Sequence, residues 1–158
     1  MSSTQIPLIS SVNLLGMPAA ANDLGIALEP LLERFGIDPR LIEKPEGFLS
    51  LQSFVNCLEA AASEYDCQYF SLLIARHRPA LGFGVLGQLI KASPNVGAAM
   101  RNSHRHLKLL SENSLWDIEV ESGLATLKRS QRHTLAGKQQ QMLSFSVAQY
   151  FQLLKGLM

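Results

Sequence analysis

The sequence predicts an α+β fold that is mostly helical, with a small antiparallel sheet and a long C-terminal helix. Apolar residues recur every three or four positions from about residue 22 to residue 110, which is the spacing of helices with one buried face. Around residues 115–129 the spacing changes to alternation, which is typical of a β-hairpin. A second helical pattern then runs from about residue 138 to residue 158.

Composition favours one folded domain and argues against several classes of protein. The 158 residues are 47% hydrophobic and only 17% charged, as expected of a globular domain with a substantial core. The net charge of +1 provides no general attraction to nucleic acid or to an anionic membrane. No apolar run reaches the roughly 18 residues of a membrane span. The N-terminus has no basic residue before its apolar residues, unlike a secretory signal.

The cysteine content points to a reducing compartment. Cys57 and Cys67 are the two cysteines of the chain, too few for a disulfide framework or a zinc site of thiolates. We therefore expect reduced thiols in a cytoplasmic protein, with no metal and no other cofactor.

The first half of the chain should be helical. A helix that begins near Asn22 should be kinked or restarted by Pro30, which cannot donate the usual backbone hydrogen bond. Ser50 is a typical N-cap for the clearest helix, and Pro79 should end the helix after that one. The ranges expected for these helices are 22–35, 40–44, 51–65 and 68–77, after a loose leader at 1–11.

Residues 81–110 should form two helices joined at a tight corner, and we expect the rest of the chain to pack around this pair. Ser93 can accept hydrogen bonds from the free N–H groups of a helix start, and Pro94 suits the first helical position. One apolar stripe follows the corner at helical spacing: Val96, Ala99, Met100, Ser103, Leu107 and Leu110.

The hairpin should pair residues 115–120 with residues 124–129 through a two-residue turn. Its alternation places three apolar side chains on one face, which we expect to pack against the helices: Trp116, Ile118 and Val120. The final helix is apolar on most sides, and Lys138 and Lys155 are its charged residues. Such a helix should be covered on most sides, by a partner subunit or by further chain, so we expect self-association as a homodimer.

No motif of the chain indicates an enzyme. Residues 82–87 spell G-x-G-x-x-G, but the dinucleotide fingerprint requires a preceding strand, and the preceding residues look helical. His104 and His106 are two residues apart on a helix, so they point to different sides and cannot bind one metal ion together. No serine lies in a nucleophile elbow.

Several short motifs follow one another in a recognisable order. They are Gly36-Ile37-Asp38 before a short helix, the consecutive alanines at the end of the helix 51–62, Leu86-Gly87, the Ser93-Pro94 corner, and residues 107–111. In this order they resemble the N-terminal arabinose-binding-type domain of AraC-family bacterial transcription regulators, over roughly residues 20–157. The resemblance implies a domain that senses a small effector and often dimerises, while a separate C-terminal domain with two helix-turn-helix units binds promoter DNA.

On this resemblance, residues 1–158 are the regulatory domain of a longer regulator, and the helix-turn-helix domain is absent from this chain. The family name does not make arabinose the effector, because relatives respond to diverse molecules. Two other interpretations stay open. One is a dimerisation module without a ligand. The other is a haem or gas sensor, since the order of helices and hairpin is loosely similar to haem-nitric-oxide domains, although their Y-x-S-x-R motif is missing here.

An effector pocket should be mostly apolar with a few converging polar groups, and we expect it between the helical pair, the hairpin and the final helix. Its expected walls are Phe83, Leu86, Met100, Leu107, Trp116 and Tyr150. His104 should reach a polar ligand group from the border of the apolar stripe. Arg101 and Arg105 would favour an anionic effector, although these basic residues also fit an ordinary solvated helix face.

Overall fold

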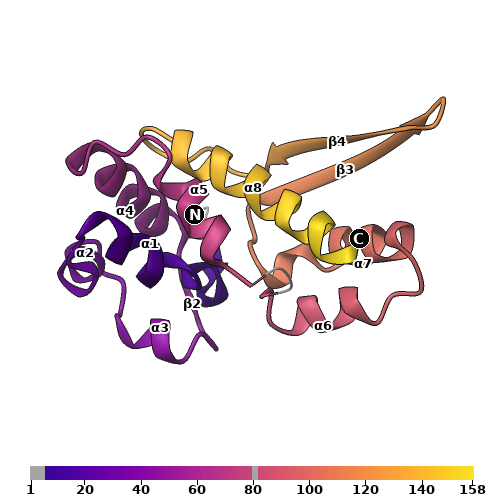
Figure 1. The fold of residues 1–158 in the computed structure, drawn as a ribbon. Coiled ribbons are helices and arrows are strands. Elements are labelled where there is room, and N and C mark those ends of the chain that lie inside the picture. The colour runs from indigo at the N-terminus through magenta and orange to yellow at the C-terminus, as the bar shows by residue number, and fades with distance from the viewer. Residues whose placement is uncertain (1–5, 80–81) are drawn as a thin grey trace.

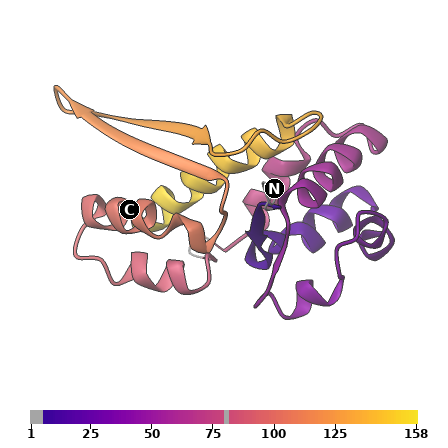
Figure 2. The ribbon, with the colours of Figure 1, turned by 180° about the vertical axis from the view of Figure 1, so that it is seen from behind.

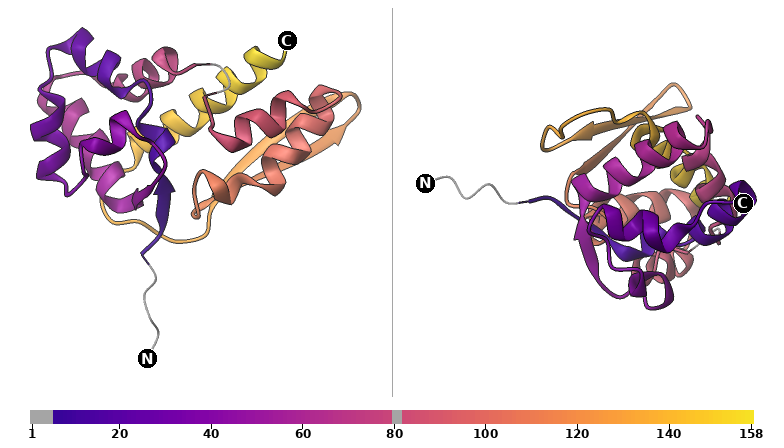
Figure 3. Two further views of the ribbon diagram at one scale, coloured as in Figure 1. Left: turned by 90° about the horizontal axis from the view of Figure 1, so that it is seen from below. Right: turned by 90° about the vertical axis from the view of Figure 1, so that its left-hand side faces the viewer.

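The computed structural model describes residues 6–79 and 82–158, and these form two lobes joined by one long helix, α8 (Gln140–Leu157). The first lobe, at the left of Figure 1, holds the helices of the N-terminal half, and the second holds two further helices and a long hairpin. Figure 3 shows the same division from below. The α+β class predicted from the sequence is confirmed.

The first lobe is built mainly from helices whose starts and ends follow from local sequence. Ser50 is the N-cap of α4, and its hydroxyl accepts a hydrogen bond from the Ser53 N–H at 3.2 Å, as predicted. Its elements are β1 (Leu8–Ser10), η1 (Ser11–Leu14), α1 (Met17–Leu24), α2 (Leu28–Arg34), α3 (Arg40–Glu43), β2 (Phe48–Ser50), α4 (Leu51–Glu64) and α5 (Phe70–His77).

The helix expected over residues 22–35 is instead two helices, and the break lies before Pro30. Gly25 ends α1 in the left-handed conformation, with φ of 67°. Pro30 occupies the first turn of α2, where its missing N–H would have no partner within the helix. The expected restart of the helix is therefore present, and it begins at Leu28, just before Pro30.

The expected loose leader contains a strand that ties the two lobes together. Within residues 1–11, the first five lie outside the described residues, while β1 pairs antiparallel with β2. On its other side, the Ser10 N–H donates to the Leu110 carbonyl at 2.8 Å, and the Glu112 N–H donates to the Leu8 carbonyl at 3.1 Å. β1 therefore lies between β2 and the segment that enters the hairpin.

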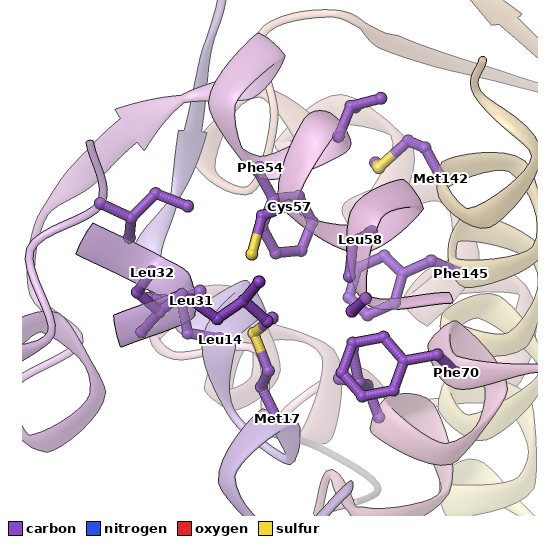
Figure 4. Packing of buried hydrophobic residues seen from close by; sticks show 14 of the residues in the cluster. Leu14, Met17, Leu31, Leu32, Phe54, Cys57, Leu58, Phe70, Met142 and Phe145 are labelled. Carbon is purple, nitrogen blue, oxygen red and sulfur yellow. The ribbon is translucent and has the colours of Figure 1, made fainter. Parts of the chain in front are cut away.

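The larger hydrophobic core lies in the first lobe, where α8 reaches into it. In Figure 4, Met142 and Phe145 extend from α8 toward Leu58 and Phe70. The rings of Phe145 and Phe54 meet edge to face, with centroids 5.6 Å apart. The expectation that the whole chain packs around residues 81–110 is therefore wrong, because the helical pair belongs to a smaller core in the second lobe.

The helical pair consists of α6 (Val85–Lys91) and α7 (Val96–Arg105), followed by the short 3-10 helix η2 (Leu107–Leu109). The corner was predicted, but its cap is Asn95, whose side chain accepts from the Ala98 N–H at 2.9 Å. Ser93, the predicted cap, lies earlier in the corner. It donates to the Leu89 carbonyl and accepts from the Asn102 amide.

The hairpin consists of β3 (Ser114–Glu121) and β4 (Leu124–Gln131), in the register that pairs Trp116 with Arg129. Both turn residues, 122 and 123, have positive φ, as the predicted tight turn requires. Trp116 is buried and Ile118 is half-buried, but Val120 is 73% exposed. The prediction for Val120 is wrong because the far end of the hairpin extends beyond the helices (Figure 2).

Helix α8 has one buried side and one exposed apolar side. The buried side contributes to both cores, with Met142 and Phe145 in the first lobe and Tyr150 and Leu153 in the second. We call the exposed side the α8 stripe; it comprises Leu143, Val147 and Phe151, which are 48%, 60% and 64% exposed.

The packing predicts a large difference between two phenylalanines. Phe54 is fully buried, so Phe54→Ala should lower the free energy of unfolding by about 3–5 kcal/mol. Phe48 is 53% exposed on β2, so Phe48→Ala should lower it by about 1 kcal/mol or less. Urea unfolding of both variants checks this, and equal losses would contradict the described core.

Candidate functional site

A cavity lies mainly in the second lobe, against α8 and the inner end of the hairpin, and Ile9 of the first-lobe core also lines it. Its volume is about 60 Å³, and its walls are largely apolar. Residues far apart in sequence form them: Ile9, Asn13, Phe83, Leu86, Ile90, Ser103, Leu107, Leu110, Ser111, Ser114, Trp116, Met142, Phe145, Ser146, Gln149, Tyr150 and Leu153. A cavity of this size holds water or a small part of a ligand, so a larger molecule would have to displace wall side chains.

The structure places most of the predicted pocket residues on this cavity. Five of the eight contribute to its walls: Phe83, Leu86, Leu107, Trp116 and Tyr150. Met100 packs in the same core but does not line the cavity. Arg101 is exposed on α7 away from it, and His104 faces a neighbouring hollow. The reason is that Ser103 occupies the inward position of the last turn of α7, and His104 follows on the outer side.

Gln149 on α8 is the most unusual polar residue of the wall. It is 7% exposed, yet neither atom of its side-chain amide has a hydrogen-bond partner among the described residues. Gln141, two turns earlier on the same helix, shows the normal arrangement. Its Oε1 accepts from the Ser71 N–H at 3.0 Å, and its Nε2 donates to the Gln68 carbonyl at 2.8 Å. A buried amide without partners is costly, so Gln149 is a candidate for contact with a ligand.

Trp116 and Tyr150 form the aromatic part of the wall. Their ring centroids are 4.2 Å apart, and the rings are tilted by 35°. The Tyr150 hydroxyl lies 3.1 Å from Ser103 Oγ, which also donates to the Met100 carbonyl at 2.8 Å. Burial raises the pKa of Tyr150 above its ordinary value of 10.0, against a smaller lowering from the hydrogen bond with Ser103.

A buried cation lies one layer behind the cavity. Arg78 is 3% exposed and caps α5, and its Nη1 donates to Asn13 Oδ1 at 3.3 Å while its Nε donates to the Gly82 carbonyl at 2.7 Å. Its guanidinium also lies 4.3 Å from the centroid of the Phe83 ring. Burial lowers the pKa of Arg78 to about 9, so the group is still charged at neutral pH. Its Nη2 has no partner among residues 6–79 and 82–158.

A second hollow adjoins the cavity on the outer side of α7 and η2. It has a volume of about 70 Å³ and a more polar lining: His104, Arg105, Leu107, Lys108, Ser111, Glu112, Ser114, Leu115, Trp116 and Arg132. We call it the outer hollow. His104 therefore belongs to a site next to the cavity and not to the cavity itself.

Other candidate chemistry receives no geometric support. Among the described residues, the element directly before the glycines of residues 82–87 is helix α5 and not a strand, so the context of a dinucleotide site is missing. Within residues 6–79 and 82–158, no three His, Cys, Asp or Glu side chains are grouped closely enough to hold a metal ion. Cys57 and Cys67 are free and buried, and burial raises the pKa of the Cys57 thiol to about 12. No described helix is long and apolar enough to cross a membrane.

Sequence reasoning missed the polar residues of the wall. Asn13 approaches the cavity from η1, and Ser111 from the segment between η2 and β3. No local pattern places either residue there. Gln149 was missed because it lies inside an otherwise apolar helix. A buried glutamine one turn from Phe145 and next to Tyr150 was the signal that could have identified it.

Comparison with a family model and with individual proteins points to transcription regulators in both cases. Residues 25–158 match the family described as the arabinose-binding domain of AraC transcription regulators, N-terminal. The chain is 39% identical over 89 residues to the HTH-type transcriptional regulator VirS of Mycobacterium tuberculosis, in strains CDC 1551 / Oshkosh and ATCC 25618 / H37Rv. The aligned stretch covers 56% of this chain and 25% of each relative.

The cavity wall predicts a pH effect that depends on Tyr150. Folding favours the neutral Tyr150 hydroxyl, because burial raises its pKa in the folded state. The stabilisation from this neutral hydroxyl is therefore complete below the pKa of the unfolded chain, near 10.0, and is lost as the pH rises through the pKa of the folded protein. Wild type should lose more stability than Tyr150→Phe between about pH 8 and about pH 10.5. At about pH 8 the substitution should cost only about 0.5–1.5 kcal/mol. Urea unfolding at both pH values measures this, and parallel losses would contradict a buried hydroxyl.

Proposed function

Because this chain belongs to the family of N-terminal arabinose-binding domains of AraC transcription regulators, we propose that its cavity binds a small effector and thereby controls a separate helix-turn-helix domain. The family is one of transcription regulators and not a class of enzymes. Specific promoter binding then belongs to the helix-turn-helix domain of the longer protein, and we propose that this protein acts in the bacterial cytoplasm.

The observation that carries the proposal is the side-chain amide of Gln149, which lies in a largely apolar wall and has no hydrogen-bond partner in the part of the chain that the structure describes. Ligand sites combine apolar surface with a few polar groups that fix the orientation of the ligand. An ordinary core would fill this space with apolar side chains or pair the amide, as it does for Gln141. Gln149 can donate and accept, so a bound molecule with one polar group would relieve its desolvation.

The composition of the cavity wall also indicates how polar the effector is. A sugar carries a hydroxyl on nearly every carbon and needs a hydrogen-bond partner for most of them when buried. The cavity instead offers leucines, isoleucines and aromatic rings with few free polar atoms. We therefore propose an effector that is less polar than arabinose.

Helix α8 gives the effector a route to the rest of the molecule. Gln149, Tyr150 and Leu153 touch the cavity from the second half of the helix, and Met142 and Phe145 lie in the core of the first lobe. A ligand that shifts α8 by a fraction of a turn would therefore change the packing of both lobes. In this proposal, that shift is the signal passed to the DNA-binding domain.

We propose that the protein also self-associates through the α8 stripe. Leu143, Val147 and Phe151 lie in one exposed row beside Leu72 of α5 and line a shallow apolar groove there. Contiguous apolar surface of this kind is typical of contacts between protein chains. This observation also keeps the dimerisation module as a second candidate function, whereas the haem interpretation has no supporting feature.

Two glutamines of α8 test the effector site. Gln149→Leu should raise the free energy of unfolding by about 1–3 kcal/mol, because it removes a buried amide without partners. Gln141→Leu, the matched control, should lower it by about 2 kcal/mol or more, since the Ser71 N–H and the Gln68 carbonyl lose their partners. Urea unfolding measures both changes.

A thermal-shift screen of small molecules then tests function. A ligand at 100 times its dissociation constant should stabilise the wild-type fold by about 2.7 kcal/mol. Its affinity should fall roughly tenfold or more in Gln149→Leu, although that variant is the more stable protein. A ligand that binds Gln149→Leu as tightly as wild type would place the effector elsewhere.

Self-association has a separate test. Wild type should form dimers at high protein concentration, and Phe151→Glu should shift the protein toward monomer because a charge in the α8 stripe opposes burial. Val85→Glu is the control, since Val85 is 75% exposed on α6 and lies outside the stripe. Sedimentation velocity distinguishes them. Monomeric wild type, or equal dimerisation of both variants, would contradict the proposal.

A further inference from the structure

The cavity and the outer hollow share one wall. Four residues line both spaces: Leu107, Ser111, Ser114 and Trp116. These residues form a thin partition, with a largely apolar space on one side and a polar one on the other. A single elongated molecule could therefore occupy both spaces if Leu107, which is half-buried in the short η2 helix, moved aside.

The outer hollow carries an excess of positive charge. Arg105, Lys108 and Arg132 line it, and none of them forms an ion pair with any residue in the described ranges 6–79 and 82–158. Among the described residues that line it, Glu112 is the single acidic one, and Glu112 Oε2 accepts a hydrogen bond from the Leu8 N–H at 3.0 Å. The cations are thus left available for an external anion.

The partition itself presents a polar group to such an anion. Ser111 is 6% exposed, and its Oγ has no hydrogen-bond partner in the part of the chain that the structure describes. Arg129 lies opposite Trp116 in the hairpin register, and its Nε is likewise buried and unpaired there. The residues around the partition therefore offer a free hydroxyl and cationic groups with little competing negative charge.

We propose that the effector is an amphipathic organic acid, with its apolar body in the cavity and its carboxylate at the partition, where Ser111 Oγ donates to it and Arg105 and Arg132 face it. This inference rests on the proposed function and adds the chemical class of the ligand. The cavity alone would accept a neutral molecule equally well. The charge of the outer hollow favours an acid over its amide, and it disfavours an amine.

Matched probes test the class of ligand. The pairs are hexanoate with hexanamide, and 3-phenylpropanoate with 3-phenylpropanamide, titrated by calorimetry at neutral pH, where the acids are ionised. We expect the acid of at least one pair to bind roughly tenfold or more tightly than its amide, since hydrogen bonds to charged groups are the stronger ones.

Variants of the intact chain locate the two ends of the probe. The double variant Arg105→Gln/Arg132→Gln should remove the preference for the acid and leave amide affinity within roughly twofold. Arg101→Gln is the control, because Arg101 is exposed on the same helix as Arg105 and lines neither space. Ser146→Leu should weaken both members of a pair by filling the cavity. Among the described residues, the Ser146 hydroxyl bonds only to the Met142 carbonyl of its own helix, so its loss breaks no described contact between elements.

The two proposals fail in different ways. An amide that binds as well as its acid, or an acid that is unaffected by the double variant, overturns the acidic class. If Ser146→Leu still weakens binding in that case, the cavity remains an effector site for neutral molecules. Acid binding that is insensitive to Ser146→Leu rejects the cavity and leaves only a surface anion site. Failure of all four probes to bind overturns the acidic class as stated.

Discussion

The structure depends on one helix that must satisfy two hydrophobic cores. The N-terminal half of α8 places Met142 and Phe145 among the helices of the first lobe, and its C-terminal half places Tyr150 and Leu153 against α6, α7 and the hairpin. Because a helix is rigid over this length, the lobes cannot repack independently around it. Strand β1 adds a second tie through its hydrogen bonds to Leu110 and Glu112. The cavity lies between α8 and β1, so residues of both lobes determine how its walls pack.

This position explains why the domain tolerates buried groups that a purely structural core would avoid. Gln149 and Ser111 are buried with unpaired polar atoms, and Arg78 is a buried cation without a carboxylate partner in the described residues. Each such group lowers stability by an amount comparable to a whole hydrogen bond or more. In the first lobe, both side-chain amide atoms of the buried Gln141 are paired, and Ser71 Oγ is a buried polar atom there without a partner among the described residues. Natural proteins depart from good packing mainly at functional sites, so the clustering of these groups around one cavity is the physical argument for binding.

The sequence predicted those features that local chemistry decides. The Ser50 cap, the 122–123 turn and the change from helical to alternating spacing each depend on a few neighbouring residues, and each is present. Predictions failed where tertiary packing decides. Val120 lies on the same face of the strand as Trp116, but it is exposed because the hairpin extends beyond the helices that would cover it. His104 was expected to reach the cavity from the border of the apolar stripe, yet Ser103 takes the inward position and His104 lines the outer hollow. Asn13 and Ser111 could not be predicted at all, because they come from segments that meet only in the folded chain.

The central claim, that the cavity of the second lobe is the effector site, can be tested with the tryptophan on its wall. Trp116 is the single tryptophan of the chain, so all tryptophan fluorescence arises beside the cavity and the partition. A ligand that stabilises the domain against heat should change the Trp116 emission saturably, with the same dissociation constant that calorimetry gives. A ligand that stabilises the domain but leaves the emission of Trp116 unchanged at saturation would show that it binds elsewhere.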